Sequence, residues 1–76
     1  MESTFYTIKR IIVALMDIEP SIVKPESRVA HDLGADSLDK VEIIMHVEKK
    51  FEIAIHDDFE YSTVQDLVDF IDAHKK

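Results

Sequence analysis

One glycine and two prolines in 76 residues leave long stretches of this chain with nothing to interrupt a helix. The first stretch has apolar residues at steps of three and four, like the buried stripe of an amphipathic helix: Phe5, Ile8, Ile11, Ile12 and Leu15. Ser3 or Thr4 can cap the start of this helix. Pro20 should end it by about Glu19, because the residue before a proline avoids the α conformation.

A second helix is predicted over residues 37–50. Asp36 is a suitable N-cap for it, and Asp39 stands three residues further on, as in a variant of the capping box. Both carboxylates also favour the positive end of the helix dipole. These two acids therefore place the start of the helix near Ser37.

A third helix is predicted near the C-terminus from apolar residues spaced i, i+3, i+4 and i+7: Val64, Leu67, Val68 and Ile71. Ser62 with Gln65 would form a capping box, and Thr63 with Asp66 a variant of one. The chain ends in one histidine and two lysines, cations that suit the C-terminus of a helix.

Two other segments lack helical periodicity. Residues 20–35 contain both prolines and the glycine, and they are predicted to form a long ordered loop, which in a compact domain is usually functional. Residues 51–55 alternate like a strand, but no partner strand is predicted, so an extended connector is expected, followed by one helical turn over 57–61. The predicted fold is all-α: one domain over residues 1–76, a small four-helix bundle of three main helices and one short helix, with the long loop between helices 1 and 2.

The charge of the chain narrows the partners that it can bind. The chain is 33% charged with a net charge of −7, which disfavours nucleic acid and anionic membranes and favours proteins with basic surfaces. It has no cysteine, so it has neither disulfides nor a thiolate metal site. No apolar run approaches the roughly 20 residues of a membrane span, and the start does not resemble a signal peptide. A cytoplasmic, monomeric protein is expected.

The helix predicted over residues 37–50 is more apolar than docking on a core requires. Its apolar residues fall in two rows on different sides: Leu38, Val41 and Met45, and then Ile44, Val47 and Phe51. Acidic residues border the first row: Asp36, Asp39, Glu42 and Glu48. The helix could be central and buried on both sides, or its first row could face a partner protein. The acidic rim favours the second interpretation, a small transient docking surface.

Ser37 lies at the start of this helix, where a serine is most often a cap, but Asp36 competes for that role. A catalytic nucleophile is disfavoured, because the chain has no Gly-x-Ser-x-Gly motif and no histidine that can be nominated as a base. A phosphodiester suits the free N–H groups of a helix start. No catalytic residue is therefore predicted. No metal site is predicted either, because the acids and histidines are not spaced as metal ligands are.

The run Asp-Leu-Gly-Ala-Asp-Ser-Leu-Asp over residues 32–39 resembles the prosthetic-group attachment site of acyl carrier proteins. Residues 41–43, Glu48 and Phe51 follow in the expected register, and weaker similarity covers nearly the whole chain. The resemblance implies a non-enzymatic carrier, in which Ser37 bears a 4'-phosphopantetheine arm derived from coenzyme A that holds acyl groups as thioesters. It also implies a phosphopantetheinyl transferase and acyl-transferring and acyl-elongating enzymes with basic docking patches as partners.

The same resemblance implies two sets of binding residues. Partner enzymes would contact the acids and the first apolar row: Asp36, Leu38, Asp39, Val41, Glu42, Met45 and Glu48. The acyl chain would lie between the helices against residues that are equally plain core residues: Ile44, Val47, Ile55, Leu67 and Phe70.

The pathway stays open at this point. Fatty acid or related lipid biosynthesis is favoured, and the alternatives are a specialised lipid or polyketide pathway and an unmodified acidic adaptor domain. Three lysines occupy helix positions that are usually uncharged or acidic in fatty-acid carriers: Lys40, Lys49 and Lys50. They are interpreted either as a filter against the partners of other carriers or as residues that point to solvent.

Overall fold

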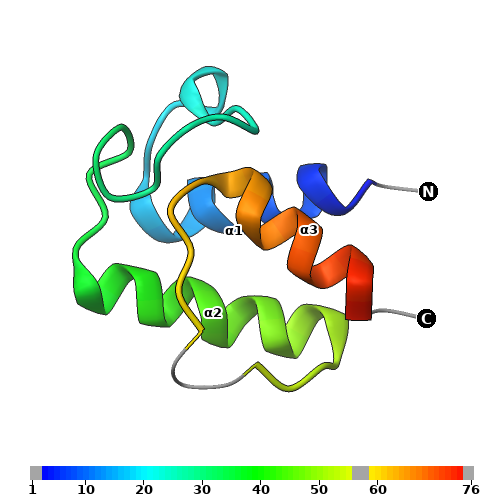
Figure 1. Cartoon of the computed structure of the whole chain (residues 1–76). Helices are drawn as coiled ribbons and strands as arrows, with labels where there is room; N and C mark the ends of the chain where they lie inside the picture. The colour runs from blue at the N-terminus through cyan, green and yellow to red at the C-terminus, as the bar shows by residue number, and fades with distance from the viewer. Residues whose placement is uncertain (1–2, 56–58, 75–76) are drawn as a thin grey trace.

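The computed structural model describes residues 3–55 and 59–74, in which three α-helices and one short 3-10 turn enclose an apolar core. The elements are α1 (Thr4–Met16), η1 (Pro20–Ile22), α2 (Ser37–Phe51) and α3 (Val64–His74). α1 packs against both α2 and α3, and the loop before α2 lies across one end of the helices (Figure 1). The all-α prediction is confirmed for this part of the chain.

The predicted fourth helix is only partly within the described residues. Asp57 and Asp58 lie outside them, and Phe59 to Tyr61 are not helical. The short helical element that the structure does contain is η1, in the long loop. The predicted four-helix bundle is therefore confirmed only as three helices with one 3-10 turn.

α1 begins where the sequence predicts and ends early. Ser3 caps its first turn, because its side chain accepts a hydrogen bond from a backbone N–H at 3.1 Å. The helix ends at Met16 rather than near Glu19, because Asp17 adopts the left-handed conformation with φ of 54° and donates its N–H one turn back. A left-handed residue stops the helical ladder, so Pro20 starts η1 instead of ending α1.

Buried apolar side chains and backbone hydrogen bonds to the start of α3 hold the long loop over residues 17–36 in place. Its buried apolar side chains are Val23, Val29, Leu33 and Ala35. The N–H of Val29 donates to the carbonyl of Ser62 at 2.8 Å, and the N–H of Val64 donates to the carbonyl of Ser27 at 3.0 Å. The prediction of a long ordered loop is confirmed, and the loop is fastened to a segment far along the chain.

The core is small and built from all three helices. Its fully buried members on the helices are Ile8, Ile12, Ile43, Val47, Val64, Leu67 and Ile71. A chain of this length buries only about 60% of its unfolded surface, so each of these side chains contributes a large share of the total stability.

Thr63 and Asp66 form the capping box of α3. The N–H of Asp66 donates to Thr63 Oγ1 at 3.1 Å, and Asp66 Oδ2 accepts the N–H groups of Thr63 at 3.0 Å and Ser62 at 2.8 Å. The alternative box of Ser62 with Gln65 is wrong, because the Gln65 side-chain amide donates to Asp69 instead. The hydrogen bonds from the backbone of Thr63 and then Ser62 hold the pKa of Asp66 below its ordinary value.

Asp66→Asn is expected to lower the free energy of unfolding at neutral pH and to flatten its pH dependence in acid. A carboxyl group with a lowered folded pKa contributes stability above its unfolded pKa and loses it as the pH falls through the folded pKa. The loss should stay below about 1 kcal/mol at neutral pH, because the group is exposed, and should shrink below about pH 4. Urea unfolding across this pH range measures it.

Asp69→Asn is the matched control, since it removes the same charge from the same helix without touching the cap. It should keep the wild-type pH slope. Equal pH profiles for Asp66→Asn and the wild type would contradict the role assigned to the Asp66 carboxylate.

Candidate functional site

α2 begins with a reciprocal capping box. The N–H of Asp39 donates to Asp36 Oδ1 at 2.9 Å, and the N–H of Asp36 donates to Asp39 Oδ2 at 3.2 Å. Gly34 turns the chain just before this box with φ of 80°, a conformation in which any other residue would be strained. The predicted cap is confirmed, and it makes Ser37 the first residue of the helix.

Ser37 has a side chain that the fold does not use. It is exposed, and its hydroxyl has no hydrogen-bond partner in the part of the chain that the structure describes. The carboxylate of Asp36 accepts the N–H of Asp39, and the carbonyl of Asp36 accepts the N–H of Lys40 at 3.0 Å. The N–H groups of Ser37 and Leu38 have no partner among the described residues. Such N–H groups at a helix start bind anions. The site can therefore hold a phosphate ester on the Ser37 oxygen.

α2 has one apolar side in solvent and another in the core. Leu38, Val41 and Met45 are 73%, 55% and 58% exposed. Ile43 and Val47 on the other side are fully buried. The first of the two rows predicted from the sequence is therefore at the surface, while Ile43, which neither row included, is fully buried in the core.

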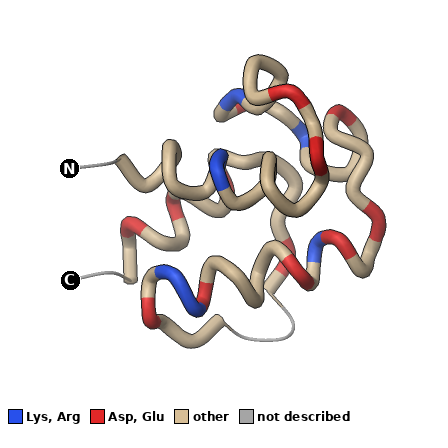
Figure 2. Tube along the Cα trace, turned by 180° about the vertical axis from the view of Figure 1, so that it is seen from behind, with Lys and Arg blue, Asp and Glu red and all other residues tan. Residues whose placement is uncertain are grey.

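Charged residues are distributed unevenly along α2 (Figure 2). Asp36 and Glu42 are exposed near the start of α2, with Asp39 half-buried between them. Lys49 and Lys50 lie in the last turn of the helix. The half of α2 next to Ser37 therefore presents apolar side chains with an acidic rim.

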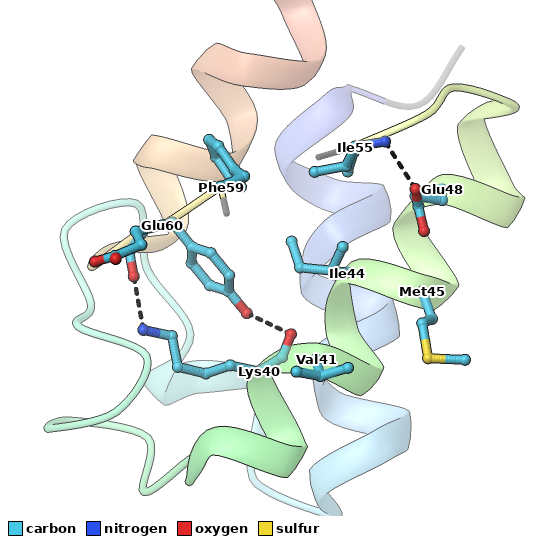
Figure 3. A pocket seen from close by; sticks show the side chains of 9 residues that line it. Lys40, Val41, Ile44, Met45, Glu48, Ile55, Phe59 and Glu60 are labelled. Atoms are coloured by element: carbon cyan, nitrogen blue, oxygen red, sulfur yellow. Dashed lines mark hydrogen bonds between the residues drawn. The ribbon is translucent and has the colours of Figure 1, made fainter. Parts of the chain in front are cut away.

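Glu48 has different surroundings from the other predicted docking acids. It is half-buried, and its Oε2 accepts the N–H of Ile55 at 2.7 Å (Figure 3). This hydrogen bond ties the segment after α2 back to the helix. The structure therefore separates Glu48 from the acidic rim, and a role for it in docking stays a prediction.

A cavity of about 400 Å³ lies between α2 and the connector that leads to α3 (Figure 3). Its lining consists of Lys40, Val41, Ile44, Met45, Glu48, Ile55, Phe59, Glu60 and Tyr61. Two of the predicted acyl-chain residues, Ile44 and Ile55, are in this lining. Val47 and Leu67 are fully buried in the core instead.

The aromatic part of the cavity wall was missed by the sequence-based prediction. Phe59 and Tyr61 line the cavity, and the predicted residue Phe70 lies next to Phe59, with ring centroids 4.4 Å apart. Phe59 and Tyr61 are two positions apart in the sequence, as Ile53 and Ile55 are. Alternate residues of an extended chain point to one side, so this pattern was the signal that could have found them.

Lys40 is bound to the connector rather than pointing to solvent. Its Nζ donates to the carbonyl of Tyr61 at 2.9 Å, and the Tyr61 hydroxyl donates to the carbonyl of Lys40 at 3.0 Å. The ammonium lies 4.8 Å from the centroid of the Tyr61 ring, a cation–π contact. Burial raises the pKa of Tyr61. The interpretation of Lys40 as a solvent-exposed charge is therefore wrong.

Comparison with known proteins places this chain in a family. Residues 7–71 match the family model described as phosphopantetheine attachment site. An acyl carrier protein of Helicobacter hepaticus is 45% identical over 74 residues, which cover 95% of this chain and 97% of the relative. The chain belongs to the acyl carrier protein family. Its covalent prosthetic group is accordingly 4'-phosphopantetheine.

Other acyl carrier proteins are equally similar. That of Campylobacter jejuni strain RM1221 is 47% identical over 76 residues, covering 97% of this chain and 99% of the relative. That of Wolinella succinogenes is 44% identical over 73 residues, covering 93% and 96%. The matched region of this acyl carrier protein contains the capped start of α2, its exposed row and the whole cavity lining. None of the helices within residues 3–55 and 59–74 has the length and apolar character needed to span a membrane.

Proposed function

We propose that Ser37 bears the 4'-phosphopantetheine arm of this carrier. The observation that supports the proposal is an exposed hydroxyl, unused by the fold, at the first position of a helix that another residue caps. The phosphodiester would lie beside the N–H groups of Ser37 and Leu38, where the helix dipole favours negative charge. In the transfer, the Ser37 oxygen forms a bond to the pantetheine-side phosphate of coenzyme A, and the nucleotide with the other phosphate leaves. The transferase would supply the base.

The exposed side of α2 is proposed as the docking surface for partner enzymes. Leu38, Val41 and Met45 offer apolar contact, and Asp39 and Glu42 offer negative charge to arginine and lysine side chains. An apolar row of three side chains is small, which suits brief encounters with the transferase and with acyl-transferring and acyl-elongating enzymes in turn. The carrier itself would catalyse no step, and it would work in the cytoplasm.

The cavity beside α2 is proposed to shelter the acyl chain, with Ile44 and Ile55 as apolar walls. Fatty acid biosynthesis is the pathway we favour, since acyl carriers typically serve it. A specialised lipid or polyketide pathway is the second candidate, because charged side chains also line the cavity, Lys40 and Glu48 among them.

The test is intact mass spectrometry before and after incubation with a phosphopantetheinyl transferase and coenzyme A. The expected result is the gain of one arm, mapped by proteolysis to the peptide that contains Ser37. An unmodified adaptor domain would gain no mass and yet bind partner enzymes. No gain, or a gain that maps to another peptide, would overturn the assignment of Ser37.

Glu42→Lys is expected to slow association with the transferase by about tenfold at low ionic strength, because it reverses the charge at the rim of the exposed row. The effect should shrink at about 0.15 M salt, where the Debye length is roughly 8 Å. Met45→Ala should act mainly on dissociation, because it removes apolar contact. Stopped-flow binding at several salt concentrations separates the two rates.

Glu26→Lys is the matched control, because it makes the same charge change at an exposed position in the loop before α2. It should slow association far less than Glu42→Lys does. Equal rates for the two variants would mean that overall charge, and not the α2 surface, guides the encounter.

A further inference from the structure

Two hollows adjoin on α1, and neither shares a lining residue with the cavity of Figure 3. The first lies between α1 and α2, and its lining includes the half-buried Ile11 and Leu15 beside Arg10, His46 and Lys50. The second lies between α1 and the start of η1, and its lining includes Tyr6, Lys9, Val13 and Pro20. Arg10 and Ala14 line both hollows, so the two form one surface, which we call the α1 groove.

All charged side chains that line the α1 groove within the described residues are basic, although acidic residues outnumber Lys and Arg by 16 to 9 in the whole chain. Figure 2 shows the basic stretch of α1 and the basic last turn of α2 on neighbouring helices. Glu48 lines the cavity instead and binds the N–H of Ile55, and Glu52 lines neither hollow. Lys50 has no ion-pair partner in the part of the chain that the structure describes. The groove therefore carries local positive charge on an acidic protein.

The shape and charge of the α1 groove fit an acidic amphipathic helix. The apolar side of such a helix would pack on Ile11 and Leu15, and its carboxylates would lie near the ammonium of Lys50 and the guanidinium of Arg10. A flat lipid surface fits less well, because these two apolar side chains are half-buried in a hollow and do not project from it. A second copy of this chain also fits less well, because each copy has a net charge of −7 and the two repel each other.

We propose that the α1 groove binds an acidic amphipathic helix of a partner protein, at a surface separate from the docking side of α2. The exposed row of Leu38, Val41 and Met45 lines neither hollow. Lys50 lies roughly 20 Å beyond Ser37 along α2, at about 1.5 Å per residue. A helix held in the groove therefore leaves Ser37 and the exposed row open to a second protein. Binding in the groove does not depend on the arm at Ser37.

The test uses a synthetic amphipathic helix with leucine on one side and glutamate on the other, added to the isotope-labelled full chain without its arm. At about 0.15 M salt the Debye length is roughly 8 Å, so acids far from the groove are screened. The amide resonances of Ile11, Leu15 and Lys50 should shift on titration, and those of Leu38 and Val41 should not. A peptide with lysine in place of glutamate should leave the groove resonances unchanged.

Lys50→Glu is expected to weaken binding of the leucine–glutamate peptide by about tenfold, because it sets a like charge against the peptide carboxylates. Lys50 is exposed, so the variant should fold as the wild type does. Lys24→Glu is the matched control, because it makes the same charge change at an exposed loop position that lines neither hollow. The control should keep the wild-type affinity.

Several outcomes would overturn the proposed partner. They are a peptide that does not bind, shifts confined to the exposed row of α2, or equal weakening by Lys50→Glu and Lys24→Glu. Groove shifts that grow with protein concentration in the absence of peptide would identify a second copy as the occupant. Groove shifts with phosphatidylglycerol vesicles, and none with the peptide, would identify a lipid surface. The assignment of the arm to Ser37 is tested separately by intact mass and stands or falls independently of these results.

Discussion

Ser37→Ala is expected to abolish the gain of phosphopantetheine mass completely and to leave the fold intact. The chemistry needs the Ser37 oxygen, whereas the fold does not, because the carboxylate of Asp36 satisfies the first turn of α2. The free energy of unfolding should change by no more than about 0.5 kcal/mol, as is usual for an exposed site. Intact mass after transferase treatment measures the gain of the arm, and urea unfolding of the same preparation measures the stability.

Ser62→Ala is the matched control, because Ser62 is also an exposed serine just ahead of a helix. Ser62→Ala should gain the phosphopantetheine arm as the wild type does. A Ser37→Ala protein that still gains the arm would show that another residue is the acceptor.

Ile43→Ala is expected to produce the largest loss of stability of any single change on α2. Ile43 is fully buried among the core side chains of all three helices. Truncating a buried isoleucine to alanine costs about 2–5 kcal/mol, while a core of this size rarely supplies more than about 3–5 kcal/mol in total. The variant should be largely unfolded at 25 °C, as circular dichroism with urea titration would show.

Leu38→Ala removes a similar side chain from the opposite side of the same helix. Leu38 is 73% exposed, so the expected change in unfolding free energy is within about 0.5 kcal/mol. Comparable losses for the two variants would contradict the division of α2 into a core side and a surface side.

The three helices and their N-caps could be predicted because their signals are local. The capping box of Asp36 with Asp39, and that of Thr63 with Asp66, each spans four residues of sequence. The exposed row of α2 could be located because acids border it. The end of α1 could not be predicted, because the left-handed residue that ends it is Asp17. The residue that usually signals such an ending is glycine.

The cavity was harder to predict because its walls come from distant segments. Lys40 and Tyr61 are 21 residues apart, and no spacing rule connects a helix residue to a connector residue at that distance. From sequence alone Lys40 is a charge on a helix surface, where lysine is ordinarily solvated. Only the tertiary structure shows that its ammonium meets a carbonyl and a ring. Val47 and Leu67 are fully buried in the core, and contact between them and an acyl chain stays a prediction.

The fastening of the long loop to the start of α3 links the presentation of Ser37 to a segment that is synthesised after α2. The carbonyl of Ser62 accepts the N–H of Val29, whose own carbonyl accepts the N–H of Ala35, next to the N-cap of α2. A ribosome makes the chain from its N-terminus, so Val29 has no Ser62 to bond until the segment that follows α2 has emerged. A nascent chain that has completed α2 still lacks the backbone hydrogen bonds between the long loop and the start of α3, so the loop that precedes Ser37 is fully fastened only after α3 begins to be made.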